Sequence, residues 1–329
     1  MTGTKDGTAA ETAAQADRQV ERHVDVVRRF NRSYTQRVGA LEDSFLGTGM
    51  PLGTARLLFE IGTEPGTTRD LRARLGLDSG YLSRLLRRLE SDGLVAVVPD
   101  PDDRRRRRVD LTAAGRRAWD DLERRSVDRA RDLVAPLTVR QRARLAAALA
   151  EADLLVRAAT VTLERVDPAS EIARRAVAAY VTELDERFPG GFDPGPRPAA
   201  GEPDPEDARL APPSGAFVVA TSDGEPVACG GVRTLANGAD GCAVGRVVGG
   251  VGEIKRMWVH PGWRGAGLGS RLLRHLEGVS RDLGHREVRL DTNGTLTEAV
   301  AMYERAGYRR IARYNDNPYA EHFFAKRLG

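Results

Sequence analysis

Cysteine and long apolar runs are both scarce in this 329-residue sequence. The two cysteines, Cys229 and Cys242, are too few and too poorly spaced for a disulfide framework or a zinc site, so we predict small buried thiols and no metal site. No apolar run approaches the ~20 residues of a membrane span, and the first 17 residues lack the apolar core of a signal peptide. The sequence therefore predicts a cytoplasmic protein that does not bind membranes.

Charge is distributed unevenly along the chain, although the whole chain carries only +4. Residues 1–166 contain 30 Lys and Arg against 25 Asp and Glu, whereas residues 167–329 contain 21 against 22. Within the first half, residues 66–117 contain 13 basic and 8 acidic side chains, so the whole excess lies in this segment. A local basic surface of this kind indicates a polyanionic partner.

The most informative segment of the second half reads as a strand, a glycine loop and a helix. The strand, residues 253–259, ends at His260-Pro261, and three glycines follow within residues 264–269. The apolar face of the helix repeats every three or four residues, at Leu268, Leu272, Leu276, Val279 and Leu283. Such a loop presents free backbone N–H groups at a helix N-terminus and can hold a phosphate, or it is a tight turn without a ligand.

The pattern of this loop excludes two common nucleotide sites. The sequence R-x-x-G-x-G at Arg264, Gly267 and Gly269 follows V-H-P and has neither the lysine of a P-loop nor the ribose-binding acid of a Rossmann turn. It resembles the acyl-CoA pyrophosphate loop of the GNAT family of N-acetyltransferases, and the resemblance extends from about Val161 to the C-terminus. The resemblance implies an α/β (α+β) fold with a mixed, mostly antiparallel sheet, acetyl-CoA as cofactor and no metal.

The same resemblance implies a set of cofactor and catalytic residues. Tyr303 is expected to protonate the departing thiolate, and Glu253 to act as base through water. The alternatives are that Tyr303 is a core aromatic and that Glu253 is an exposed acid at a strand end; Glu298, His260 and His322 are weaker candidates. The expected cofactor contacts are Met257, Trp258, Val259, Arg264, Gly265, Ala266, Gly267, Leu268, Gly269, Ser270, Asn293 and Tyr303.

The acceptor site is expected between two loops, residues 188–193 and 314–319. Acids and aromatic residues in both loops favour a small cationic or aromatic amine. Arg233, on a predicted strand, could instead pair with a carboxylate, which would favour an amino acid. The expected substrate residues are Phe188, Phe192, Arg233, Tyr314 and Asp316.

Residues 67–112, which make up most of this basic segment, read as two short helices and a hairpin. A capping pattern at 67–70 starts the first helix, Gly76 stops it, and Asp78 caps a second helix that ends at about Ser91. Leucines fall on one face of the second helix and arginines on the other. A hairpin with Arg104–Arg108 near its tip follows. The spacing is that of a helix-turn-helix with a basic wing, and the alternative is a solvated arginine surface.

The hairpin and its flanks resemble the winged helix-turn-helix of the MarR family of transcription regulators. Asp103-Arg104 and Leu111-Thr112 match the D-R and L-T of that family. The resemblance implies a double-stranded DNA operator, and a homodimer formed through the first and last helices of the domain. The expected DNA contacts are Ser79, Tyr81, Arg84, Arg87, Arg88, Arg104, Arg105 and Arg106, with the hairpin arginines on the DNA backbone.

We therefore expect three regions: a disordered arm at 1–16, a mainly α MarR-like DNA-binding and dimerisation domain at 17–157, and a GNAT-like domain at 158–329. The expected function is a transcriptional regulator that also acetylates a small amine, with DNA binding tuned by substrate or acetyl-CoA. The alternatives are a repressor that senses CoA or another ligand without turnover, and a protein lysine acetyltransferase. No Gly/Ser linker separates the domains, so we expect them to be coupled.

Overall fold

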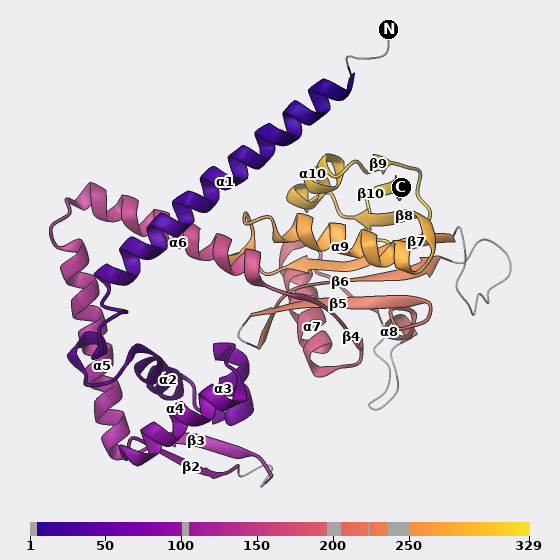
Figure 1. Cartoon of the computed structure of the whole chain (residues 1–329). Coiled ribbons are helices and arrows are strands. Elements are labelled where there is room, and N and C mark those ends of the chain that lie inside the picture. Colours follow the sequence, from indigo (N-terminus) through magenta and orange to yellow (C-terminus); the bar gives the residue numbers. More distant parts are fainter. Residues whose placement is uncertain (1–4, 101–104, 196–204, 223, 236–249) are drawn as a thin grey trace. The chain divides into compact units, whose positions relative to one another are not determined.

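The computed structural model describes residues 5–100, 105–195, 205–222, 224–235 and 250–329 (Figure 1). The chain divides into two compact units, unit 1 at Met1–Ala143 and unit 2 at Arg144–Gly329. The division falls inside the helix α6 (Val139–Thr160). The domain boundary that the sequence suggests, at residue 157, stays a prediction. The two units are described in turn.

Unit 1 is mainly helical and carries one small antiparallel sheet, in the order β1-β3-β2. Gly66 pairs with Val109 and Val95 pairs with Leu111, so the hairpin is tied to the start of the helix pair. Its elements before α6 are α1 (Lys5–Arg37), the 3₁₀ turn η1 (Phe45–Gly47), α2 (Leu52–Thr63), β1 (Gly66–Thr67), α3 (Thr68–Leu75), α4 (Ser79–Ser91), β2 (Val95–Pro99), β3 (Arg107–Leu111) and α5 (Ala113–Val134).

Local sequence signals set the boundaries of α3 and α4. Thr67 and Asp70 form a reciprocal capping box, and Gly76 ends α3 in the left-handed region at φ 61°. The Asp78 side chain accepts a hydrogen bond from the Tyr81 backbone N–H at 2.9 Å and so caps α4. The leucines of α4 are buried and its arginines are exposed, as the helical wheel predicts. The helix-turn-helix and its hairpin are thereby confirmed as folded elements.

The N-terminal arm is a correction. Residues 5–16, which the sequence analysis assigns to a disordered arm, form the first turns of α1. Alanine dominates this stretch and has the highest helix propensity, so the segment extends the helix that follows it. Further along α1, apolar side chains remain exposed at helical spacing: Val20, Val24, Val27, Phe30 and Tyr34. We call these exposed residues the α1 stripe.

Unit 2 is a seven-stranded sheet with helices on both faces, in the order β4-β5-β6-β7-β8-β10-β9. Every neighbouring pair is antiparallel except β7 and β8, which run parallel. The mixed, mostly antiparallel sheet is therefore confirmed. Its elements are β4 (Leu163–Val166), α7 (Glu171–Arg187), α8 (Pro205–Arg209), β5 (Gly215–Ser222), β6 (Glu225–Leu235), β7 (Gly250–Val259), the 3₁₀ turn η2 (Pro261–Trp263), α9 (Leu268–Asp282), β8 (His285–Thr292), α10 (Thr297–Arg305), β9 (Arg309–Arg310) and β10 (His322–Arg327).

The two faces of the sheet bury alternate residues of the same strand, as a pleated strand requires. On β5, Ala216 and Val218 join the core beneath α9, whereas Phe217 and Val219 join the core beneath α7. Cys229 lies on the α7 side, and burial raises the pKa of its thiol to about 12. Cys229 is thus the small buried thiol that the sequence predicts, while Cys242 lies outside the described residues.

Strands β7 and β8 separate partway along their length. Their parallel pairing runs from Gly250 to Glu253 on β7, and the remaining residues of β7 pair with β6 alone among the described strands. A bulge interrupts the β6 pairing beside this point, where Arg256 has the left-handed φ of 53°. The backbone of β7 beyond Glu253 is therefore not engaged by β8, and this separation positions the site described below.

One buried histidine predicts how the stability of unit 2 depends on pH. His285 is 4% exposed, and its ring nitrogens lie 2.9 Å from the Ser280 and Thr234 hydroxyl oxygens. Thr234 donates to the Ser214 carbonyl at 2.8 Å, so the imidazole donates to Thr234 and accepts from Ser280, which is the arrangement of a neutral ring.

Burial lowers the pKa of His285 below its usual 6.5. Below about pH 6.5 the His285 imidazole therefore binds a proton in the unfolded chain but not in the folded chain. The free energy of unfolding consequently falls as the pH drops through that range. We expect His285→Gln to be less stable at pH 7.5 but to lose part of this acid dependence, as measured by urea unfolding between pH 7.5 and 5. His23→Gln, on the exposed face of α1, serves as the control; an equal acid slope in both variants would contradict the assignment.

Candidate functional site

The glycine loop between β7 and α9 leaves a helix end open. Gly265 and Gly267 have φ of 84° and 79°, and no atom lies within 4 Å of where a Cβ would stand on either residue. Gly267 is the N-cap of α9, and no side chain caps this helix. The first backbone N–H groups of α9 and the positive end of its dipole are thus available to an anion.

Arg264, at the start of the loop, supports the loop through its side chain. Its guanidinium pairs with both oxygens of Glu183 on α7, and its Nε donates to the Val259 carbonyl at 3.0 Å. Trp258 Nε1 donates to the same carboxylate at 2.8 Å. Burial alone would raise the pKa of Glu183, but the hydrogen bonds from Arg264 and Trp258 lower it. Two of the expected cofactor contacts, Arg264 and Trp258, therefore hold the end of β7 against α7.

Tyr303 on α10 reaches β7 from the opposite side. It is 5% exposed, and its hydroxyl lies 3.8 Å from the Met257 sulfur. Its ring packs 5.9 Å from the rings of Tyr308 and Phe324, which fits the core-aromatic alternative, while its hydroxyl points to β7. Burial, with the nearby charge of Asp291, raises the pKa of Tyr303. The phenol is consequently protonated at ordinary pH and can act only as a donor or a neutral acceptor.

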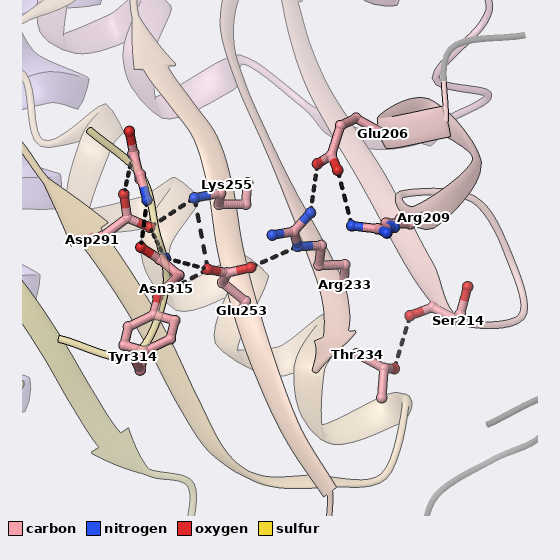
Figure 2. A network of polar contacts seen from close by, with 11 residues as sticks. Glu206, Arg209, Ser214, Arg233, Thr234, Glu253, Lys255, Asp291, Tyr314 and Asn315 are labelled. Carbon is pink, nitrogen blue, oxygen red and sulfur yellow. Dashed lines mark hydrogen bonds and ion pairs between the residues drawn. The ribbon is translucent and has the colours of Figure 1, made fainter. Parts of the chain in front are cut away.

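Glu253 is the centre of a buried polar network (Figure 2). Its side chain is 0% exposed, which rules out the alternative of an exposed acid at a strand end. Arg233 Nε donates to Oε2 at 2.6 Å, while the Tyr314 hydroxyl and the Asn315 amide donate to Oε1 at 3.0 and 3.2 Å. Both carboxylate oxygens are therefore occupied, and the only proton path outward among these contacts is through Tyr314, which is half-buried.

A second carboxylate, Asp291, completes the network and was not among the expected site residues. Its side chain is 3% exposed and accepts from Lys255 Nζ at 2.7 Å, Asn315 at 3.0 Å and Asn317 at 2.6 Å. Burial alone would raise the pKa of Asp291, but the charge of Lys255 and these hydrogen bonds lower it. In the sequence, the feature that could have pointed to this network is the pair Asn315 and Asn317, on either side of Asp316. Asp316 itself is exposed.

The short helix α8 joins the site through two ion pairs. Glu206 pairs with Arg233, and Asp207 accepts from Arg256 at 2.5 Å (Figure 2 shows the first pair). The sequence analysis assigns no element to residues 205–209, so α8 and its contacts were missed. Arg233 thus bridges Glu206 and Glu253, which leaves it already neutralised on two sides.

The two expected acceptor loops meet, as the sequence analysis anticipates. Phe188 and Phe192 pack around Tyr319, with ring centroids 5.6 and 4.9 Å from it, and the Tyr319 hydroxyl accepts from the Asp193 backbone N–H at 2.8 Å. Asn293 donates to the Tyr319 carbonyl at 2.7 Å. Asn293 therefore fixes the second loop through its side chain, a different role from the expected cofactor contact.

The other expected polar groups lie away from this network. Glu298 pairs with Arg187 at 3.2 Å, and His260 caps the turn η2 by accepting from the Gly262 N–H at 3.1 Å. His322 lies 3.3 Å from Arg310. Each of these side chains has a local structural partner, and none contacts Glu253 or Tyr303 in the hydrogen bonds described for them.

In unit 1, α4 presents a basic surface. Ser79, Tyr81, Arg84 and Arg87 are exposed, and the Arg84 guanidinium lies 5.6 Å from the centre of the Tyr81 ring. Arg88 is exposed but pairs with Asp92 at 2.8 Å. At the hairpin, Arg105 and Arg106 are exposed, and Arg104 lies outside the described residues. The exposed face of α4 and the hairpin carry positive charge on neighbouring elements of one fold.

No group of three or more His, Cys, Asp and Glu side chains in the described ranges is arranged to hold a metal ion. No helix in the same ranges is long and apolar enough to cross a membrane.

Comparison with known proteins relates each unit to a family. Residues 178–308 match the model of the acetyltransferase (GNAT) family, and residues 48–106 match that of the MarR family. An IAA acetyltransferase of Azospirillum brasilense is 31% identical over 45% of this chain and 84% of its own length. The N-alpha-acetyltransferase RimI of Mycobacterium tuberculosis is 33% identical over 42% of this chain and 75% of its own. The transcriptional activatory protein BadR of Rhodopseudomonas palustris is 36% identical over 26% of this chain and 39% of its own.

The buried network predicts a large cost for removing the charge of Glu253. Glu253→Gln leaves Arg233 and Lys255 without one of their two carboxylates, and because removing one partner of a buried pair costs about 3–5 kcal/mol, we expect a loss of about 3 kcal/mol. Urea unfolding followed by the fluorescence of Trp258 and Trp263, in a Trp119→Phe background, would measure it in unit 2.

The matched control is Glu225→Gln, since Glu225 pairs with Arg175 on the surface, where pairs contribute below about 1 kcal/mol. Equal losses in the two variants would show that Glu253 is not held as the structure indicates.

Proposed function

The chain belongs to the GNAT family of acetyltransferases and carries a MarR-family domain ahead of that fold, and we propose that it is a DNA-binding regulator that acetylates a small amine from acetyl-CoA. The observation that carries the catalytic half is the convergence on one strand, β7, of an uncapped helix N-terminus, a protonated tyrosine and a buried carboxylate. The uncapped α9 and the open glycines fit the pyrophosphate of a CoA thioester.

Acetyl-CoA would supply the acetyl group as a thioester, and the residues of this chain would bind it and move two protons. The α9 N–H groups, from Leu268 onward, would hold the pyrophosphate, and the unpaired side of β7 would receive the rest of the molecule. Tyr303 would donate its phenolic proton to the departing sulfur, as the residue expected to be the acid. The raised pKa of Tyr303 keeps that proton in place until the sulfur leaves.

The base would be Glu253 acting through Tyr314. The Glu253 side chain is fully buried, and the Tyr314 hydroxyl donates a hydrogen bond to it. The attacking amine would therefore pass its proton to the Tyr314 oxygen while Tyr314 passes its own proton to Glu253. Burial and the charge of Glu253 raise the pKa of Tyr314, so a free phenolate is unfavourable and the two transfers should be concerted. In this proposal Tyr314 takes the place of the water molecule through which the sequence analysis expects Glu253 to act as base.

The acceptor we favour is a small cationic or aromatic amine. The aromatic cluster of Phe188, Phe192 and Tyr319 offers an apolar, π-rich wall, whereas Arg233 is already paired with Glu206 and Glu253. A substrate carboxylate would have to displace one of these acids, which weighs against the amino-acid alternative. RimI carries the name of an N-alpha-acetyltransferase, so a protein amine is kept as the alternative acceptor.

For DNA, we propose that α4 enters the major groove and that the hairpin arginines contact the backbone. The exposed Arg84 and Arg87 lie on the face of α4 opposite its buried leucines, and Ser79 and Tyr81 are exposed in its first turn, where a recognition helix meets the bases. We propose a homodimer because the α1 stripe and the exposed Leu149 and Val156 of α6 are apolar surfaces on the first and last helices of the domain.

The catalytic proposal predicts thiol release from acetyl-CoA with one class of amine in a panel of polyamines, aromatic amines, amino acids, aminoglycosides and lysine peptides. Tyr303→Phe should lower kcat by about 100-fold with little change in KM for acetyl-CoA, because general acids contribute about 10²–10⁴-fold.

Tyr308→Phe is the matched control, since it removes a hydroxyl from the neighbouring ring, and we expect its rate within about twofold of the parent. An unchanged rate in Tyr303→Phe would remove its assignment. Binding of acetyl-CoA without turnover of any amine would favour the non-catalytic sensor.

The DNA proposal separates two kinds of arginine. Arg84→Ala and Arg87→Ala should each weaken binding to a duplex selected from a random library by about tenfold and relax its sequence preference, because base contacts contribute about 1–3 kcal/mol. Arg106→Ala should weaken all duplexes alike and lower the salt slope by about 1. Fluorescence anisotropy at several salt concentrations measures both the affinity and its salt slope.

The control is Arg131→Ala, which removes an exposed arginine of α5. A loss of DNA affinity as large as that of Arg84→Ala would reject the assigned surface.

A further inference from the structure

The C-terminal end of α6 is capped by an arginine of α9. Arg271 Nη1 donates to the Ala158 carbonyl at 2.6 Å and to the Ala159 carbonyl at 3.4 Å, and Nη2 donates to the Val161 carbonyl at 2.5 Å. The last carbonyls of a helix have no partner within the helix and carry the negative end of its dipole. One guanidinium therefore satisfies two of these groups and the Val161 carbonyl just beyond the helix, and it neutralises the helix end.

A second contact holds the same helix end from the other side of the glycine loop. The Arg157 guanidinium lies 4.8 Å from the centre of the Trp263 ring, and Trp263 is 6% exposed. Ala158, Val161 and Trp263 also belong to one buried core, together with Leu268. The end of α6 is thus packed against the residues that start and follow the loop, and not merely connected to unit 2 by the chain.

These two contacts bracket the loop in sequence. Trp263 directly precedes the segment 264–270, and Arg271 directly follows it. The loop is therefore flanked on both sides by a residue that contacts α6. Residues 139–143 of α6 belong to unit 1 and the rest to unit 2, so α6 is the covalent route between them.

We propose that Arg157 and Arg271 are positioning residues of the cofactor loop, and that occupation of the loop by acetyl-CoA is transmitted through them to α6. The proposal rests on the function proposed above for the glycine loop. An anion held by the N–H groups of residues 267–270 restrains the first turn of α9, which contains Arg271 and thereby the α6 carbonyls. A ligand that orders the loop then also orders the end of α6. By thermodynamic linkage, ordering of the end of α6 must in turn raise the affinity of the loop for that ligand.

Hydrogen exchange on the full chain tests the structural step without a DNA ligand. We expect acetyl-CoA to slow exchange of the amides at residues 156–161, where Val161 N–H donates to the Arg157 carbonyl at 3.0 Å, by about five- to tenfold. Residues of α2 serve as the internal control. Unchanged exchange at 156–161 with acetyl-CoA bound would overturn the proposal.

Variants then assign the effect to the two arginines. Arg157→Ala removes a side chain that is 44% exposed and should leave the fold intact, and Arg271→Lys keeps the charge but cannot span three carbonyls. Both should weaken acetyl-CoA binding by about five- to tenfold with kcat nearly unchanged, and should abolish the exchange response. The matched control is Arg281→Ala, which removes an α9 arginine that also donates to a backbone carbonyl, that of Gly329, and it should behave as the parent.

The regulatory consequence is measured as the ratio of DNA affinities with and without saturating acetyl-CoA, using a duplex selected from a random library. We expect a ratio of about five or more in the parent, in either direction, and a ratio near one in Arg157→Ala and Arg271→Lys. A ratio of one in the parent, or the parental ratio in both variants, would overturn the proposal. Failure of the parent to bind acetyl-CoA at all would instead reject the function proposed for the loop.

Discussion

The burial of one carboxylate constrains most of unit 2. An ionised side chain with no exposed surface is costly unless charge and hydrogen bonds compensate it, and Glu253 requires donors from several elements to be tolerated. Strand β6 supplies Arg233, β7 supplies Lys255, and the segment after β9 supplies Tyr314 and Asn315. Arg233 in turn attracts Glu206 of α8. Segments far apart in sequence are therefore gathered at the point where β7 leaves β8.

At the same point the pairing of strands in the sheet changes. Parallel pairing ends at Glu253, and the bulge at Arg256 turns the outer half of β7 away from a regular ladder. A central strand normally satisfies its backbone groups on both sides, so a half-paired strand in the middle of a sheet is available to a ligand. The polar network on one side of this opening and the Tyr303 hydroxyl on the other give the two groups proposed to transfer protons separate environments.

Periodic and capping signals could be predicted from the sequence because their causes are local. The capping box at Thr67, the leucine face of α4 and the glycines that open α9 each depend on residues within a few positions of one another. The contacts that the prediction missed depend on the fold. Asp291 of β8 and Asn317, in the segment before β10, lie 26 residues apart and meet only because β8 pairs with β10. Arg264 matched a motif, yet its guanidinium is held by Glu183, 81 residues away. The helical start of α1 was missed because a polar, alanine-rich stretch is compatible with both states.

The division of the chain within α6 also bears on whether the two units can be separated. Unit 2 buries Ala158 from the end of a helix whose first turn belongs to unit 1, so neither unit possesses that helix alone. A helix is nucleated cooperatively, and fraying of its first turn lowers the stability of its last. A truncation that discards one unit would therefore damage an element that the other uses, and a destabilising substitution in α6 would impair both. A fusion made through a shared helix is for this reason harder to undo than one made through a flexible linker.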